Sequence, residues 1–182
     1  DPTNNFIFIP AEVEKGAGLI RYDRTSKDFV TALKGSASGV YSSDPITWNK
    51  NNDDYGALDP SEFTSYNTVL TAEEWAGNGR LFEWMNPLMA PTETADVRWR
   101  SNIPSVAHEG LKFDTKGNLY FVDESNSGSI YKFVPKVKND LSLGQSFVLK
   151  VETYNGLPNE NWDSNSNKAA TRTGKAKWLP IT

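Results

Sequence analysis

The stretch "SVAHEGLKFDTKGNLYFVDE", residues 105–124, decides the fold class. Two short apolar runs, 110–113 and 119–122, flank the segment "DTKGN" at 114–118. Asp, Gly and Asn favour tight turns, and Gly117 suits a left-handed backbone conformation. The segment therefore predicts a β-hairpin. It also opens on "HEG" and closes on "DE", polar ends that a hairpin does not require.

Comparable runs recur along the whole chain, and turn residues separate most of them. Each run has the length and the aromatic or β-branched content of a strand. They lie at 5–10, 18–23, 28–33, 66–75, 79–84, 109–114, 118–124, 129–135, 146–154 and 176–181. Asp59 followed by Pro60 resembles a helix start, so we expect one short helix at 59–65. The pattern predicts an all-β protein.

Three strand starts share a form, with a glycine followed by an apolar residue and an aromatic one: Gly18, Gly79 and Gly128. Weak repetition of antiparallel meanders predicts β-propeller blades of four-stranded antiparallel sheets, within one domain over 1–182. A β-sandwich or barrel is the alternative. With roughly 40–50 residues per blade, 182 residues give about four blades, so we expect an incomplete ring or part of a larger propeller.

The composition excludes several classes of protein. Cysteine is absent, which removes disulfides, thiolate nucleophiles and zinc–thiolate sites. The net charge of -4 argues against a nucleic-acid partner, and no apolar run is long enough for a membrane span. The glycine-rich segments 16–21, 35–39 and 77–82 fail the patterns of dinucleotide-binding loops and serine nucleophile elbows.

Carboxylates at strand ends are the main chemical signal. They are Glu73, Glu74, Glu109, Asp123 and Glu124. If strand ends from several blades converge, such carboxylates cannot all stay ionised without a cation. Oxygen ligands suit Ca²⁺, so Glu73, Glu74, Glu109 and Asp123 are the predicted metal ligands. The alternative is that they are solvated strand ends or ion-pair partners.

Three other groups offer weaker signals. His108, the only histidine, lies beside Glu109, and we take both as catalytic candidates. We expect Gly110 to let the backbone approach a neighbouring segment closely. The segment "DSNSNK" at 163–168 resembles the start of a calcium loop, but Lys168 replaces the required glycine, which favours a polar turn. Two arginines in "DVRWRSN", 96–102, are expected to form surface salt bridges around a packed tryptophan.

Four segments resemble the PhoX-type alkaline phosphatase family of β-propeller proteins. They are, in chain order, "LTAEEW", "GRLFEW", "IPSVAHEGLKFDTKGNLYFVDESNSGSIYKFVP" and "TGKAKWLPIT". The match spans 69–182, and its central block also looks like the lactonase and strictosidine-synthase-like propellers. The resemblance implies a calcium-dependent phosphoesterase, exported from the cytoplasm to the periplasm, the medium or an organelle lumen. It also implies iron and calcium in the central channel, held by carboxylates.

The family's motifs can be compared with this sequence one residue at a time. The family pattern has Thr-Cys-Glu-Glu at 71–74 and His-Glu-Gly at 108–110, so Glu73, Glu74 and Glu109 are implied metal ligands. Ala72 replaces the cysteine that binds iron in the family, which puts Fe³⁺ and the phosphatase activity in question but leaves Ca²⁺. Two other hypotheses stay open. One is a non-catalytic propeller subunit, completed by another chain or docked on a larger complex. The other is a calcium-dependent lactonase-like hydrolase.

Overall fold

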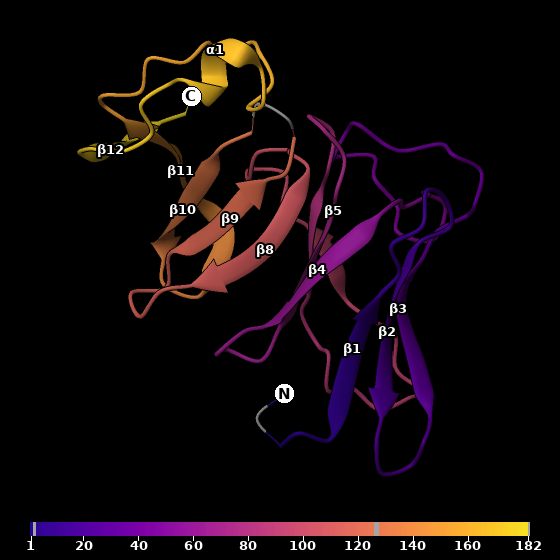
Figure 1. Ribbon diagram of the computed structural model, residues 1–182. Helices are drawn as coiled ribbons and strands as arrows, with labels where there is room; N and C mark the ends of the chain where they lie inside the picture. The colour runs from indigo at the N-terminus through magenta and orange to yellow at the C-terminus, as the bar shows by residue number, and fades with distance from the viewer. Residues whose placement is uncertain (2, 126–127, 182) are drawn as a thin grey trace.

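The computed structural model describes residues 1, 3–125 and 128–181, and these form three open antiparallel sheets and one short helix (Figure 1). Sheet 1 has the order β1-β2-β3, sheet 2 the order β4-β5-β6-β7, and sheet 3 the order β12-β11-β10-β9-β8. The strands are β1 Phe6–Pro10, β2 Gly18–Asp23, β3 Phe29–Lys34, β4 Leu58–Phe63, β5 Val69–Glu73, β6 Leu81–Trp84, β7 Val97–Trp99, β8 His108–Phe113, β9 Leu119–Asp123, β10 Ile130–Val137, β11 Asp140–Val151 and β12 Ala176–Pro180; the helix is α1 Asn165–Lys168.

The hairpin predicted from residues 105–124 is confirmed as β8 and β9. Its register runs from the pair His108 and Asp123 to the pair Phe113 and Leu119. Gly117 has a φ of 87° and donates its backbone N–H to the carbonyl of Asp114 at 3.0 Å, which closes the turn. The turn chemistry of "DTKGN" therefore sets the length of the loop and the register of the two strands.

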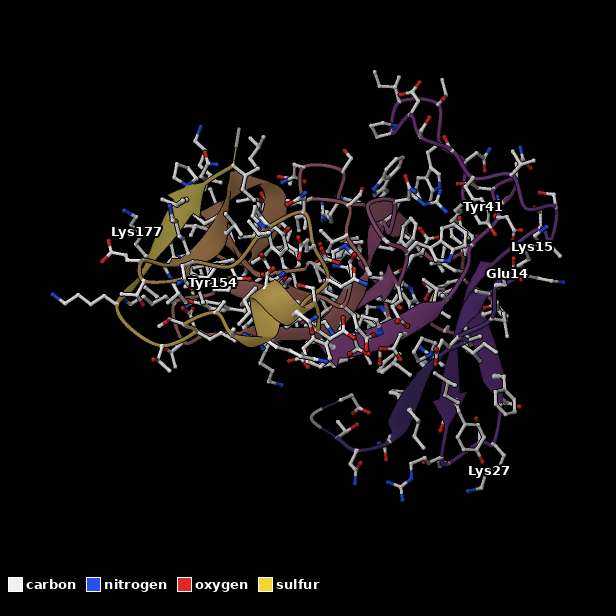
Figure 2. The ribbon with its side chains drawn as sticks, turned by 45° about the horizontal axis from the view of Figure 1, so that its top comes forward. Glu14, Lys15, Lys27, Tyr41, Tyr154 and Lys177 are labelled. Atoms are coloured by element: carbon white, nitrogen blue, oxygen red, sulfur yellow. The ribbon has the colours of Figure 1, made fainter. Side chains whose placement is uncertain are left out.

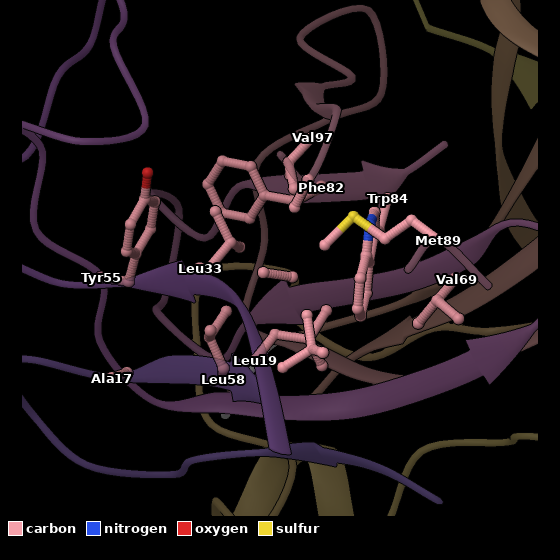
Figure 3. Packing of buried hydrophobic residues seen from close by; sticks show 13 residues of the cluster. Ala17, Leu19, Leu33, Tyr55, Leu58, Val69, Phe82, Trp84, Met89 and Val97 are labelled. Atoms are coloured by element: carbon pink, nitrogen blue, oxygen red, sulfur yellow. The ribbon is translucent and has the colours of Figure 1, made fainter. Parts of the chain in front are cut away.

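Sheet 2 lies between the other two sheets and is buried on both faces. Along β5, Val69 packs in a cluster with residues of sheet 1, whereas its neighbour Leu70 packs in a cluster with residues of sheet 3. This alternation follows the two-residue period of a strand. Figure 3 shows Trp84 of β6 in the first of these clusters, together with Leu19 of sheet 1. The core therefore consists of two layers, one on each side of sheet 2.

The first strand of sheet 2, β4, lies beside both β1 and β8. Each sheet is a meander in which consecutive strands pair, so the three sheets follow one another in chain order (Figure 1). The prediction of an all-β fold is confirmed. Only sheet 2 has the four strands expected of a blade, and the part of the chain that the structure describes contains no closed sheet or ring.

The expected helix at 59–65 is wrong, because those residues belong to β4 and the turn that follows it. Pro60 fits this strand where the register between β4 and β5 shifts, between Leu58 and Ser61, so its missing N–H disrupts no regular ladder. The buried Leu58 anchors the strand in the core. In the described ranges, no helix has the length and apolar character to cross a membrane.

Candidate metal centre

A β-bulge at Gly110 sets the direction of the side chains at the start of β8. The register with β9 shifts between Glu109 and Leu111, so Gly110 is the extra residue. His108 and Leu111 are both buried, although regular alternation over three residues would place them on opposite faces. Gly110 has a φ of 50° and no atom within 4 Å of the place a Cβ would take. The expectation of a close backbone approach is therefore wrong, and the left-handed conformation is what requires glycine.

Three carboxylates from separate segments meet near this bulge. Asp59 is the second residue of β4, Glu74 follows β5 directly, and Glu109 is the second residue of β8. Each offers one oxygen, and these oxygens all lie within 4.8 Å of one another. All three residues are half-buried.

Backbone contacts hold the three segments in place. The N–H of Glu74 donates to the carbonyl of Ala57 at 2.9 Å, which ties the end of β5 to the start of β4. Glu74 also forms an isolated antiparallel bridge with Ala107, the residue before β8. The N–H of Glu124 donates to the carbonyl of Ala107 at 2.9 Å. The site is therefore fixed by the backbone where sheets 2 and 3 meet.

Hydrogen bonding, burial and neighbouring charges raise the pKa values of two of these acids. The pKa of Glu74 is raised to about 7, chiefly by hydrogen bonding to Glu124, with further contributions from burial and from the charges of Glu12 and Asp59. Burial, followed by the charges of Asp59 and Glu124, raises the pKa of Glu109. A carboxyl that holds its proton near neutral pH marks a place where negative charge is in excess.

The donor set fits a hard divalent cation. Ca²⁺ binds carboxylate oxygens at about 2.3–2.6 Å, so two of its ligand oxygens lie at most about 5 Å apart. The spacing of up to 4.8 Å between the three oxygens satisfies this limit. Three half-buried carboxylates offer only oxygen ligands, which suit a hard divalent cation such as Ca²⁺.

The structure places Glu73 in a different environment from the other predicted ligands. Its Oε2 accepts from Arg80 Nε and its Oε1 from Arg80 Nη2, both at 2.7 Å. The remaining N–H groups of Arg80 bind Asp53 and the carbonyls of Ser42 and Asp54. Both carboxylate oxygens of Glu73 are thus used in a buried ion pair. Arg80 also borders a cavity of about 270 Å³, but it has no free donor to offer an anion there.

Asp123 and His108 also lie outside the group of three oxygens. Asp123 Oδ1 accepts from the backbone N–H groups of Ala107 at 3.2 Å and Ser125 at 3.1 Å, a role that orients the chain after β9. His108 is fully buried beside Phe121, with ring centroids 5.2 Å apart. Neither ring nitrogen has a hydrogen-bond partner in the described part of the chain, and burial lowers its pKa to about 4.

Two of the four predicted ligands, Glu74 and Glu109, therefore belong to the group of three carboxylates. The third member, Asp59, was not predicted. Sequence reasoning missed Asp59 because its pairing with Pro60 indicated a helix cap. Within β4, the same residue is held beside β8 and can meet Glu109. Asp59 lies beside Glu109 because β4 contacts β8, although the two residues are 50 positions apart in the sequence. No local sequence pattern predicts such a long-range contact.

The remaining candidates have structural roles. The segment 163–168 was expected to be a polar turn, but Asn165–Lys168 form the one-turn helix α1 with Ser164 as its N-cap. The buried amide of Asn167 bonds to backbone groups of Leu157, Glu160 and Asn161. Arg98 pairs with Asp96 on the surface, as expected. The second arginine of residues 96–102, Arg100, was also expected on the surface, and this is wrong. Arg100 is buried and forms an ion pair with the buried Glu83.

Comparison with known proteins yields no match: no family model, curated protein or solved structure is similar to this chain. The chemistry of the site is therefore argued from the positions of its own residues. Three carboxylates on two adjacent sheets and a raised pKa at Glu74 are the facts on which a function can be built.

Proposed function

We propose that this protein binds calcium through Asp59, Glu74 and Glu109. The observation that carries the proposal is the convergence of three carboxylate oxygens within 4.8 Å, from segments that are distant in the sequence. None of the three takes part in an ion pair with a lysine or arginine among residues 1, 3–125 and 128–181. A bound divalent cation would neutralise the negative charge that Glu124, Glu12 and Asp59 place around Glu74.

We further propose that the three sheets are blades of a β-propeller of the PhoX type. Three features support this arrangement: each sheet is an antiparallel meander, β4 lies beside β8, and sheet 2 packs on both faces. In a propeller the first strand of each blade lines the central channel. Asp59 and Glu109 lie on the first strands of sheets 2 and 3, so the metal site would face that channel.

The proposed reaction is calcium-dependent hydrolysis of a phosphate ester. Bound calcium would polarise a phosphoryl oxygen and lower the pKa of a coordinated water. Asp59, Glu74 and Glu109 would hold the ion, and the half-buried Glu109 would lie nearest the inner edge of sheet 3. His108 is not assigned as a base, because its ring is enclosed beside Phe121.

Iron is not part of the proposal. Ala72 is fully buried in the apolar cluster between sheets 2 and 3 and offers no ligand atom. A few carboxylates in a half-buried site suit the weak calcium affinity of extracellular modules, about 10⁻⁴–10⁻³ M. We therefore propose that the protein works outside the cytoplasm, where calcium is abundant.

The experiment is a melting curve with EDTA, CaCl₂ or MgCl₂, followed by assays on a phosphomonoester and a lactone. At a calcium concentration of about 100 Kd, binding stabilises by about 2.7 kcal/mol and raises the Tm by about 5–10 °C. Magnesium should have a smaller effect. An unchanged Tm and no calcium-dependent turnover would overturn the proposal. Stabilisation without turnover would assign the ion a structural role, as in a non-catalytic subunit, whereas lactone turnover would favour the lactonase-like alternative.

A further inference from the structure

The outer face of sheet 1, which points away from sheet 2, is apolar. The register aligns Ile7 with Tyr22 and Tyr22 with Phe29, and it aligns Ile9 with Ile20 in the next row. Ile7, Ile9 and Phe29 are 46%, 42% and 64% exposed. The rings of Tyr22 and Phe29 contact each other with centroids 4.9 Å apart. These five residues, which we name the sheet 1 face, form one continuous patch across β1, β2 and β3.

The outer face of sheet 3 carries a second apolar patch, beside the charged residues Glu109, Lys112 and Lys132. Val122 pairs with Ile130, and these side chains are 41% and 44% exposed. On the outer strands, Leu149 pairs with Trp178. Phe147 lies beside them, and Lys132 covers it with its Nζ 5.0 Å from the ring centre. We name this patch, Val122, Ile130, Phe147, Leu149 and Trp178, the sheet 3 face.

The two faces lie at opposite ends of the molecule. Sheet 2 separates them, and Figure 2 shows Lys27 of the β2–β3 turn far from Lys177 of β12. The apolar faces inside the protein are covered by a neighbouring sheet, because sheet 2 packs one face on sheet 1 and the other on sheet 3. The sheet 1 face and the sheet 3 face are thus the ends of a stack that continues the same packing.

The chain exposes more surface than its mass predicts. A folded monomer of 20.3 kDa exposes about 8,800 Å² according to the scaling of surface with mass. This chain exposes 10144 Å², an excess of about 1,300 Å². A stable interface removes about 800 Å² from each partner. Covering both faces would remove about 1,600 Å² from each copy, twice the area of one interface. The excess is of comparable size.

We propose that two copies of this chain dock head to tail, with the sheet 1 face of each copy against the sheet 3 face of the other. Both faces are β-sheet surfaces, so side chains of one can interdigitate with those of the other, as the inner faces of the three sheets do. The first strands β1, β4 and β8 lie side by side, so the three sheets fan out from one edge and both end faces can meet the same second copy. Two such contacts then close the pair and leave neither face exposed. The resulting stack contains six sheets in sequence, three from each copy. Glu109 pairs with Val122 at one edge of the sheet 3 face, so the association is tested both without and with calcium.

The test is the mass of the 182-residue chain in solution, measured by light scattering after size exclusion at micromolar concentration. We expect twice the 20.3 kDa mass of the chain, both with EDTA and with CaCl₂. A single-chain mass across the concentration range would overturn the proposal.

Two variants test the head-to-tail geometry. Phe29→Lys alters only the sheet 1 face and Ile130→Lys only the sheet 3 face, and each alone should give the monomer mass. When mixed, they should recover the double mass, because one intact contact remains between an unaltered sheet 3 face and an unaltered sheet 1 face. Ile46→Lys, at a residue 91% exposed in a loop outside both faces, is the control and should remain a dimer. A dimer that tolerates Ile130→Lys would mean that sheet 1 faces pair with each other, and this would overturn the proposal.

Discussion

Glu73 and Glu74 are adjacent in the sequence, yet the first forms a buried ion pair and the second belongs to the acidic group. Arg80 binds both carboxylate oxygens of Glu73 at 2.7 Å. Glu74 has an oxygen within 4.8 Å of oxygens of Asp59 and Glu109. Neighbouring residues on an extended strand point to opposite sides, so one peptide bond separates a structural acid from a candidate metal ligand. The same substitution should therefore reduce stability at Glu73 and calcium binding at Glu74.

Glu73→Gln should destabilise the protein by about 3–5 kcal/mol, because it leaves the buried Arg80 with only Asp53 as an anionic partner. The measurement is urea unfolding followed by tryptophan fluorescence. The rise in Tm on adding CaCl₂ should stay as large as in the wild type. If that rise disappears instead, Glu73 binds the ion and the assignment of the site to Glu74 is wrong.

Glu74→Gln and Glu109→Gln should weaken calcium binding by about tenfold or more, since each removes a carboxylate ligand. Isothermal titration with CaCl₂ measures the change. Asp163→Asn is the matched control, because Asp163 is an exposed acid in the loop that only resembles a calcium site. It should bind calcium like the wild type, and equal losses in all three variants would point to a nonspecific effect of net charge.

Most strands could be predicted from the sequence because their signals are local. The runs at 18–23 and 176–181 match β2 and β12 within a residue, and the turn at Gly117 sets the β8–β9 hairpin. In contrast, β4 was expected to be a helix. Its extended form depends on packing beside β8 and on the bulge at Pro60, both of which are tertiary effects.

The site was predictable only in part, for a related reason. The pattern of acids at strand ends identified Glu74 and Glu109. It could not separate Glu74 from Glu73, because sheet 2 is buried on both faces and β5 shows no alternation of polar and apolar residues. The third carboxylate, Asp59, required knowledge of which strands are adjacent. A single sequence contains no direct record of that contact.

His108→Leu should reduce the loss of stability in acid. The pKa of His108 is lowered by burial from 6.5 to about 4, so the unfolded chain takes up a proton before the folded one does. His108 therefore destabilises the fold increasingly as the pH falls from 6.5 to about 4. The difference in Tm between variant and wild type should grow in favour of the variant over that range. The calcium response should not change, and its loss would show that His108 supports the site.

Gly110→Ala should cost about 1–2 kcal/mol, because an alanine at a φ of 50° is strained even where no atom obstructs its Cβ. Gly110→Asn should cost less, since asparagine tolerates the left-handed region. Chemical denaturation of both variants checks the order. The alanine variant should also bind calcium less tightly, because the bulge orients Glu109. Equal stability of the two variants would argue against a left-handed bulge at this position.

Calcium binding should release a proton near neutral pH. The pKa of Glu74 is raised from 4.5 to about 7, so without metal the folded protein holds a proton that the unfolded chain has lost. This contribution to stability is present at low pH and is lost as the pH rises through about 7. Calcium replaces the proton, so titrations at pH 7 in buffers of different ionisation enthalpy should give different heats. At about two pH units above that pKa the heats should agree. In Glu74→Gln they should agree at both pH values, and a buffer-dependent heat that persists in this variant would assign the proton to another group.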